Sequence, residues 1–375
     1  MEKRTRLATC IMLAGFTCSP AVAQKVEIPD LKVDVYGFIN LAVMHADTGN
    51  GSEQYIVDND YASSRVGGFV TTALEGTDTE VGAHIEYEFQ HNPSNKVTPQ
   101  NRTIRGDFEE RHLNLFADGA FGRISVGQGH GAADDSTEMD LSGTKVASFP
   151  DLALVGGALP FVDRSGNGEN PTLFQSIRSQ DFEARYDRLR YDTPALGHAR
   201  IAVSQGYKNQ QDITEVAAVF NHTVDGLGQL SGAIGYSSKE ENENGVNDLD
   251  TLGGSISWRH RSGFNLTGVY SNGESDAGRD SDFTMIKPGY RQGRHSFTVH
   301  RAEGKDFNPE VVINKDPVTT VTISGSEVKI HGMAYVYRPV QRLEVFAAHN
   351  NFSLESQVGE YDDISITMIG SRFHF

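Results

Sequence analysis

Apolar and polar residues alternate with a period of two along most of this chain. Between residues 80 and 90 the apolar parity consists of Val81, Ala83, Ile85, Tyr87 and Phe89, and the other parity is polar or glycine. Such a period places the two sets on opposite faces of a β-strand. A single strand of this kind also fits a soluble sandwich. However, the pattern recurs, and no stretch beyond the N-terminal segment carries a sustained apolar stripe of helical period. The alternation predicts an all-β protein.

Sixteen segments have this strand-like pattern. They lie near 32–44, 64–76, 79–90, 107–118, 122–129, 181–193, 198–207, 213–223, 228–238, 249–260, 264–272, 280–290, 294–302, 326–338, 342–352 and 362–375. One of them contains Pro288, which has no N–H to donate and is expected at an edge, an end or a bulge of a strand.

The connections between these segments alternate between short and long. Short turns lie near 77–78, 119–121, 194–197, 225–228, 261–263, 291–294 and 339–341. Longer polar loops lie near 45–63, 91–106, 130–180, 208–212, 239–248, 273–279, 303–325 and 353–361. A soluble sandwich has no reason to sort its loops in this way. An outer-membrane barrel does, because its short turns face the periplasm and its longer loops face outward.

Closure of the sheet follows from the same assignment. A sheet in contact with lipid must pair every backbone N–H and C=O, so it closes on itself. Sixteen strands enclose a water-filled lumen, which explains why the inward parity can be polar. Aromatic residues support two membrane interfaces. They lie near the loop ends (Tyr87, Phe89, Tyr207, Tyr236, Tyr270) and near the turn ends (Tyr191, Phe220, Trp258, Phe264, Tyr290, Tyr337, Phe373, Phe375).

Composition excludes two classes of protein. Only 38% of the 375 residues are hydrophobic, and no run of about 20 apolar residues follows the N-terminal segment, so the chain is not a helical membrane protein. The formal charge of -17 argues against nucleic acid as a partner, because phosphate binding requires an excess of Lys and Arg.

The first 23 residues are predicted to be a signal peptide. Lys3, Arg4 and Arg6 form a basic start, an apolar stretch follows, and residues 21–23 read Ala-Val-Ala. Cleavage there would leave a barrel of residues 24–375. It would also remove both cysteines and bring the formal charge from -17 to -19, because three basic and one acidic residue are lost. The exported chain is then expected to have no disulfide and no thiolate metal site.

Several short runs carry a family resemblance. They are Val35-Tyr36-Gly37, Ser64-Arg65-Val66-Gly67, the run 121–128 (FGRISVGQ), the run 189–194 (LRYDTP), and a C-terminus that ends Phe373-His374-Phe375. In this order the chain resembles the trimeric general-diffusion porins of Gram-negative outer membranes over its whole mature length. The resemblance implies a 16-stranded antiparallel transmembrane β-barrel, a homotrimer, and a third loop folded into the lumen. It also implies an outer-membrane location, with lipid and lipopolysaccharide as neighbours.

The third loop, residues 130–180, is the longest connection, and loops longer than about 15 residues are usually functional or disordered. Its apolar run from Leu152 to Val162 is unusual for an exposed loop and gives it a reason to pack on the inner wall. The alternative is an outward fold into a subunit contact. By resemblance, acids at the start of the loop line the pore constriction: Asp134, Asp135, Glu138 and Asp140.

The opposite side of the constriction is expected to be basic. By resemblance, Arg65 and Arg111 match wall arginines. Arg188 and Arg190 share the parity of Tyr186 and should point inward. Such charges facing acids would create a transverse field that favours polar solutes. Arg111 shares the parity of Leu113 and Leu115, so simple alternation aims it at lipid or at a subunit contact. The Pro-Glu-Phe-Gly-Gly run of enterobacterial third loops is absent.

No catalytic motif is present. The chain lacks G-x-S-x-G, HExxH and EF-hand patterns, and we expect no cofactor, no metal site and no enzymatic activity. The expected function is a passive aqueous channel for small hydrophilic solutes and ions that prefers cations because of its negative charge. Alternatives are a substrate-specific channel for a sugar, phosphate or an organic acid, a barrel enzyme, and a structural or adhesin barrel.

Overall fold

The computed structural model describes residues 31–106, 108–166, 170–241, 248–275, 280–305, 310–313, 319–322, 326–356 and 359–375. The expected signal peptide, residues 1–23, lies outside the described residues.

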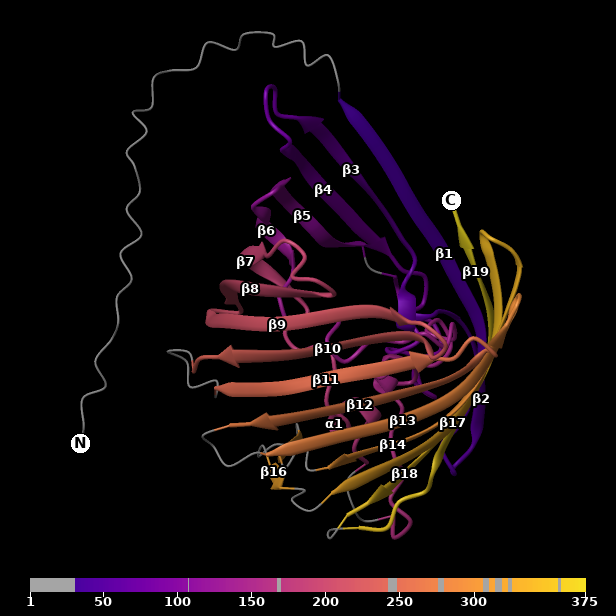
Figure 1. The fold of residues 1–375 in the computed structure, drawn as a ribbon. Coiled ribbons are helices and arrows are strands. Elements are labelled where there is room, and N and C mark those ends of the chain that lie inside the picture. The colour runs from indigo at the N-terminus through magenta and orange to yellow at the C-terminus, as the bar shows by residue number, and fades with distance from the viewer. Residues whose placement is uncertain are drawn as a thin grey trace, which may run out of the picture.

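Sixteen of the described strands form a closed antiparallel barrel, shown in Figure 1. Each strand pairs with its neighbour in the chain, and the ring closes where Phe38–Asp47 of β1 pair with Ser365–His374 of β19. The barrel strands are β1 (Lys32–Asp47), β3 (Arg65–Ala73), β4 (Glu80–Phe89), β5 (Phe108–Gly119), β6 (Gly122–His130), β7 (Arg185–Asp192), β8 (Ala199–Lys208), β9 (Gln211–Val224), β10 (Gly228–Lys239), β11 (Leu249–Arg259), β12 (Phe264–Glu274), β13 (Ser281–Gln292), β14 (His295–Lys305), β17 (Glu327–Val340), β18 (Leu343–Glu355) and β19 (Ile364–His374).

Each of the sixteen predicted segments corresponds to one of these strands, which confirms the fold class. Three further strands lie in segments that the sequence predicted to be loops. β2 (Ser52–Asp58) pairs with the loop-side half of β1, and β15 (Glu310–Ile313) pairs with β16 (Thr319–Thr322). β2 escaped prediction because its apolar residues Tyr55, Ile56 and Val57 are consecutive in the sequence and do not alternate with polar residues. In the strand Tyr55 and Val57 are buried, whereas Ile56 is exposed. At Pro288 the ladder between β13 and β14 is interrupted, as expected for a residue without an N–H.

The outward face of the barrel is apolar. Exposed aliphatic residues recur at alternate positions, for example Val33, Ile39, Leu41 and Val43 on β1. On this face aliphatic side chains can contact lipid without burying polar groups.

The largest apolar area of the inner face lies where the third loop covers it. A continuous cluster of buried side chains joins this loop to the inner wall formed by β12, β13, β14, β17, β18, β19 and β1. Ile364, Ile366 and Met368 of β19 point into this cluster, whereas Ile369 and Phe373 point outward. The last strand therefore carries apolar residues on both parities, because the third loop covers its inner face and its outer face belongs to the apolar exterior of the barrel.

Among the described residues, helical structure is limited to three short elements: η1 (Asp60–Ala62), η2 (Leu152–Leu154) and α1 (Leu173–Ser176). None of the helices in the described part of the chain has the length and apolar character needed to cross a bilayer.

Candidate functional site

The connection between β6 and β7 lies inside the barrel. Figure 1 shows its magenta trace and α1 within the ring of strands. Leu152, Leu159 and Phe161, all from the apolar run of the loop, are completely buried in the cluster on the inner wall. Burial of this apolar surface holds the loop inward. The alternative, a loop that folds outward, is wrong.

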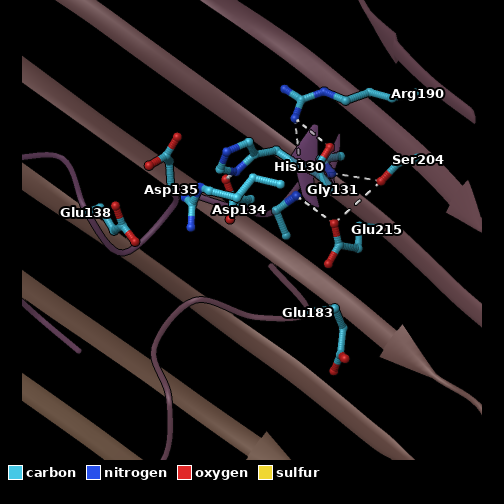
Figure 2. A network of polar contacts seen from close by, with 12 residues as sticks. His130, Gly131, Asp134, Asp135, Glu138, Glu183, Arg190, Ser204 and Glu215 are labelled. Atoms are coloured by element: carbon cyan, nitrogen blue, oxygen red, sulfur yellow. Dashed lines mark hydrogen bonds and ion pairs between the residues drawn. The ribbon is translucent and has the colours of Figure 1, made fainter. Parts of the chain in front are cut away.

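Hydrogen bonds to inward side chains fix the start of the loop, as Figure 2 shows. The backbone N–H of Ala132 donates to Ser204 of β8 at 2.8 Å, and that of Ala133 donates to Glu215 of β9 at 3.0 Å. Arg190 of β7 donates to the carbonyl oxygen of Gly131 at 2.5 Å. The loop therefore starts in one defined direction, along the inner wall past β8 and β9.

Polar contacts continue along the wall. The N–H groups of Met139 and Leu141 donate to Ser255 and Ser257 of β11, both at 2.9 Å. Farther along, Nζ of Lys287 from β13 donates to Asp140 at 2.9 Å and to the Ser148 carbonyl oxygen at 2.7 Å. Inward polar residues of the barrel thus serve as partners for loop backbone groups that would otherwise be buried without one.

Two cavities lie in the space that the loop leaves open. The lower one, of about 680 Å³, reaches the short turns at 119–122 and 193–195. The upper one, of about 580 Å³, is lined by η1, the third loop and the wall of β4, β5 and β7. Arg65 and His130 line both cavities, so they mark the constriction between them.

Arg111 points into the lumen, not outward as simple alternation predicts. Glu86 of β4 pairs with His112, whereas Tyr87 pairs with Glu110, so Arg111 is an extra residue in β5. This β-bulge turns its side chain inward. Its guanidinium group lies 2.7 Å from Glu86 and 2.7 Å from Glu88.

The other predicted arginines also point inward, at two levels. Arg65 lies in the constriction, 3.6 Å from Glu86 and over the ring of Phe38. Arg188 and Arg190 line the lower cavity. Arg188 donates to the carbonyl oxygens of Gly127 and His130, and Arg190 forms an ion pair with Asp192 at 2.8 Å.

The four predicted loop acids are separated by the fold. Asp135 and Glu138 line the upper cavity, where Lys145 lies 3.7 Å and 2.7 Å from them. Asp134 is buried against the ring of His130. Asp140 lines neither cavity, because it is buried in the ion pair with Lys287. Although burial acts to raise it, the pKa of Asp140 is held below its usual value by Lys287 and Ser142.

Sequence reasoning missed five acids and four bases that line the upper cavity. The acids are Asp60 of η1, Glu88 of β4, Glu109 of β5, and Asp151 and Asp181 of the third loop, and the bases are Lys96, Lys145, Arg185 and Arg372. Burial raises the pKa of Asp60 and of Asp151 to about 7 in each case. Burial, opposed by Lys145 and assisted by Asp181, raises the pKa of Glu138 well above its usual value. No local motif marks these residues, because they meet only after the loop folds inward.

A row of rings also lines the wall. Phe69 of β3 stacks on His84 of β4 at 4.2 Å between centroids, His84 on His112 of β5 at 4.3 Å, and His112 lies 4.5 Å from His130 of β6. His130, Asp134 and Asp135 place three potential metal-ligand atoms within 4.8 Å of one another. We assign no metal to them, because Lys145 already neutralises Asp135 and His130 already contacts Asp134.

Comparison with known proteins supports this architecture. Residues 8–355 match a family model described as Gram-negative porin. The anion-selective porin from Comamonas acidovorans superposes with a TM-score of 0.62 at 16% identity, covering 92% of this chain and 100% of that one. OmpT of Vibrio cholerae in a trimer form gives 0.58 at 13%, covering 92% and 99%. The outer membrane channel DcaP of Acinetobacter baumannii gives 0.54 at 13%, covering 92% and 97%. No curated protein matches the sequence.

Proposed function

Because the chain belongs to the Gram-negative porin family, which forms outer-membrane channels, we propose that it is a passive aqueous channel for small hydrophilic solutes and ions. Flux would follow the concentration gradient, with no reaction catalysed and no cofactor. The observation that carries the proposal is the charge pattern around the upper cavity. Arg65, Arg111 and Arg185 project from the wall, whereas Asp135, Glu138 and Asp181 come from the third loop.

This arrangement would act on solutes through a transverse field. Opposite charges on facing sides of a narrow passage orient dipolar solutes and replace part of the interactions that these solutes make with water. An apolar solute gains no such interactions in the passage. We therefore propose Arg65, Arg111, Arg188 and Arg190 as the basic wall of the pathway. We propose Asp135 and Glu138 as the acidic loop residues that meet the solute.

Planar-bilayer recording of the purified protein tests the proposal. We expect stepwise, ohmic conductance in KCl and permeation of small sugars and amino acids in liposome swelling. Absence of any conductance from correctly folded protein would contradict a channel and would favour a structural or adhesin barrel.

Cation preference is the finer part of the proposal. Its support is the formal charge of -19 expected after removal of residues 1–23. The two cavities together are lined by ten carboxylate side chains and ten Lys or Arg side chains, so the preference should be modest. Reversal potentials in a KCl gradient measure it, and an anion-selective value at neutral or alkaline pH would overturn it.

The preference should depend on pH. With pKa values of about 7, Asp60 and Asp151 are mostly protonated at pH 5.5 and mostly ionised at pH 8.5. The upper cavity therefore gains negative charge as pH rises, and the cation-to-anion permeability ratio should rise with it. Reversal potentials at both pH values, compared with those of the Asp60→Asn, Asp151→Asn variant, check this. The variant should have a smaller pH dependence than the parent, and Glu138, whose pKa is also raised, contributes to what remains.

One observation favours a second candidate, a channel with a binding site for a small anion. The lower cavity is lined by five arginines, Arg65, Arg123, Arg188, Arg190 and Arg200, but by only three carboxylates, Glu86, Asp118 and Asp192. Among the alternatives, this favours phosphate or an organic acid over a neutral sugar. Saturable block of KCl conductance by millimolar phosphate or a dicarboxylate would support this candidate, and block by none of them would leave general diffusion.

The proposal includes a homotrimer embedded among lipid and lipopolysaccharide. The apolar outward face supports contact with lipid, and one structural relative is described in a trimer form. Light scattering of the detergent-purified protein distinguishes one barrel from three.

A further inference from the structure

A recess of about 460 Å³ lies on the outer face of the barrel, across β13, β14, β17 and β18. Ile286, Val299 and Met333 line it and are at least 41% exposed, whereas the intervening Lys287 is buried on the inner side. His300, Gly332 and His349 complete this part of the lining. Pro288 adds an apolar ring at the point where the β13–β14 ladder is interrupted. The floor of this recess is therefore apolar and faces the membrane.

Basic side chains form one rim of the recess. Arg301 of β14 pairs in register with His331 of β17, which in turn pairs with Asn351 of β18. All three line the recess. Arg301 and His331 make no hydrogen bond or ion pair with any described residue.

The cations at the next two outward positions toward the loops are already neutralised. Lys305 lies 2.8 Å from Glu303, and Lys329 lies 2.6 Å from Glu355. The nearest outward carboxylate on β14, Glu303, is thus engaged elsewhere. Arg301 remains as an outward guanidinium group that forms no ion pair with a described residue, although its charge acts on Glu303 from a distance.

The height of this rim follows from the order of the residues along β14 and β17. From the turn end, the paired residues on this parity are Phe297 and Tyr335, Val299 and Met333, Arg301 and His331, and Glu303 and Lys329. Arg301 and His331 are therefore the first polar pair above the apolar band, on its loop side. An outward arginine costs about 2–4 kcal/mol at the bilayer midplane and little near the interface, so this level suits a lipid headgroup.

We propose that this recess binds one phosphorylated lipid of the outer leaflet. Its acyl chain lies on Ile286, Pro288, Val299 and Met333, and its phosphate accepts hydrogen bonds from Arg301 and His331. Arginine binds phosphate with two parallel N–H donors. The apolar floor and the basic rim are adjacent along the strands, as the acyl chain and the phosphate of a lipid are. A polar protein surface would not cover the apolar floor.

Native mass spectrometry of the detergent-extracted protein tests this. The probes are lipid A with two phosphates, the same lipid with both phosphates removed, and inorganic phosphate. We expect retention of the phosphorylated lipid only. Arg301→Gln should weaken its binding about tenfold or more, the size expected for a lost hydrogen bond between charged groups. Met333→Trp, which fills the recess, should also weaken it.

Arg294→Gln is the matched control, because Arg294 is an exposed arginine in the turn of the same β13–β14 hairpin at the opposite membrane face. It should leave lipid retention unchanged. Equal retention by the parent and Arg301→Gln, or equal retention of the dephosphorylated lipid, would overturn the proposal. A Met333→Cys variant distinguishes a second copy of the chain: efficient disulfide cross-linking between subunits at this position would mean that a neighbouring barrel occupies the recess.

Discussion

Replacing Lys287 with methionine is expected to detach the third loop from the inner wall. Lys287 is 2% exposed, and its ammonium group donates to Asp140 and to the Ser148 carbonyl oxygen. Without it, the Asp140 carboxylate remains buried with only Ser142 and Thr267 as hydrogen-bond donors. Removal of one partner of a buried ion pair costs about 3–5 kcal/mol, because the remaining charge has lost its compensation.

Hydrogen exchange at residues 139–148, measured in the reconstituted barrel, reads this loss directly. A cost of that size corresponds to exchange faster by a factor on the order of a hundred or more. The conductance should rise and become noisier, because the loop no longer holds the constriction at one width.

The double variant Lys287→Met, Asp140→Asn is the control. It removes both charges, so the carboxylate is no longer left buried alone, and the loss should be clearly smaller than in the single variant. Equal exchange rates in the parent and in Lys287→Met would mean that the apolar cluster alone holds the loop in place.

The barrel could be predicted from the sequence because its determinants are local. Alternation has a fixed period, and loop length sorts the two ends of each strand, so even β13 with Pro288 was placed within two residues of its observed bounds. The inward fold of the third loop was predictable for the same reason, since an apolar run from Leu152 to Val162 needs cover.

The constriction was only partly predictable because its determinants are tertiary. A one-residue bulge reverses the direction of Arg111, and alternation cannot detect an extra residue. Asp140 resembles the other loop acids in sequence, but its position opposite Lys287 removes it from the pathway. Asp60, Asp151 and Asp181 come from segments far apart in the chain and share one cavity only after folding.

Replacing Arg111 with methionine is expected to have the second large effect, on ion selectivity. Arg111 is 8% exposed, and its guanidinium group bridges Glu86 and Glu88, which are also buried. Without Arg111, the carboxylates of Glu86 and Glu88 remain beside the constriction. Arg65 then lies 3.6 Å from Glu86 and is its remaining ion-pair partner. The pore should become more cation-selective, which a KCl reversal potential measures. The barrel should also lose about 3–5 kcal/mol of stability, because a buried pair is broken on one side.

Two companion variants make this prediction a test of the β-bulge itself. Arg111→Lys keeps the charge but not the two-pronged geometry, so selectivity should stay near that of the parent while part of the stability is lost. Glu110 is exposed on the outer face next to Tyr87, so Glu110→Gln should leave selectivity unchanged. Without the bulge, the two adjacent residues would exchange faces, and the effects would be reversed: Glu110→Gln would shift the reversal potential and Arg111→Met would not.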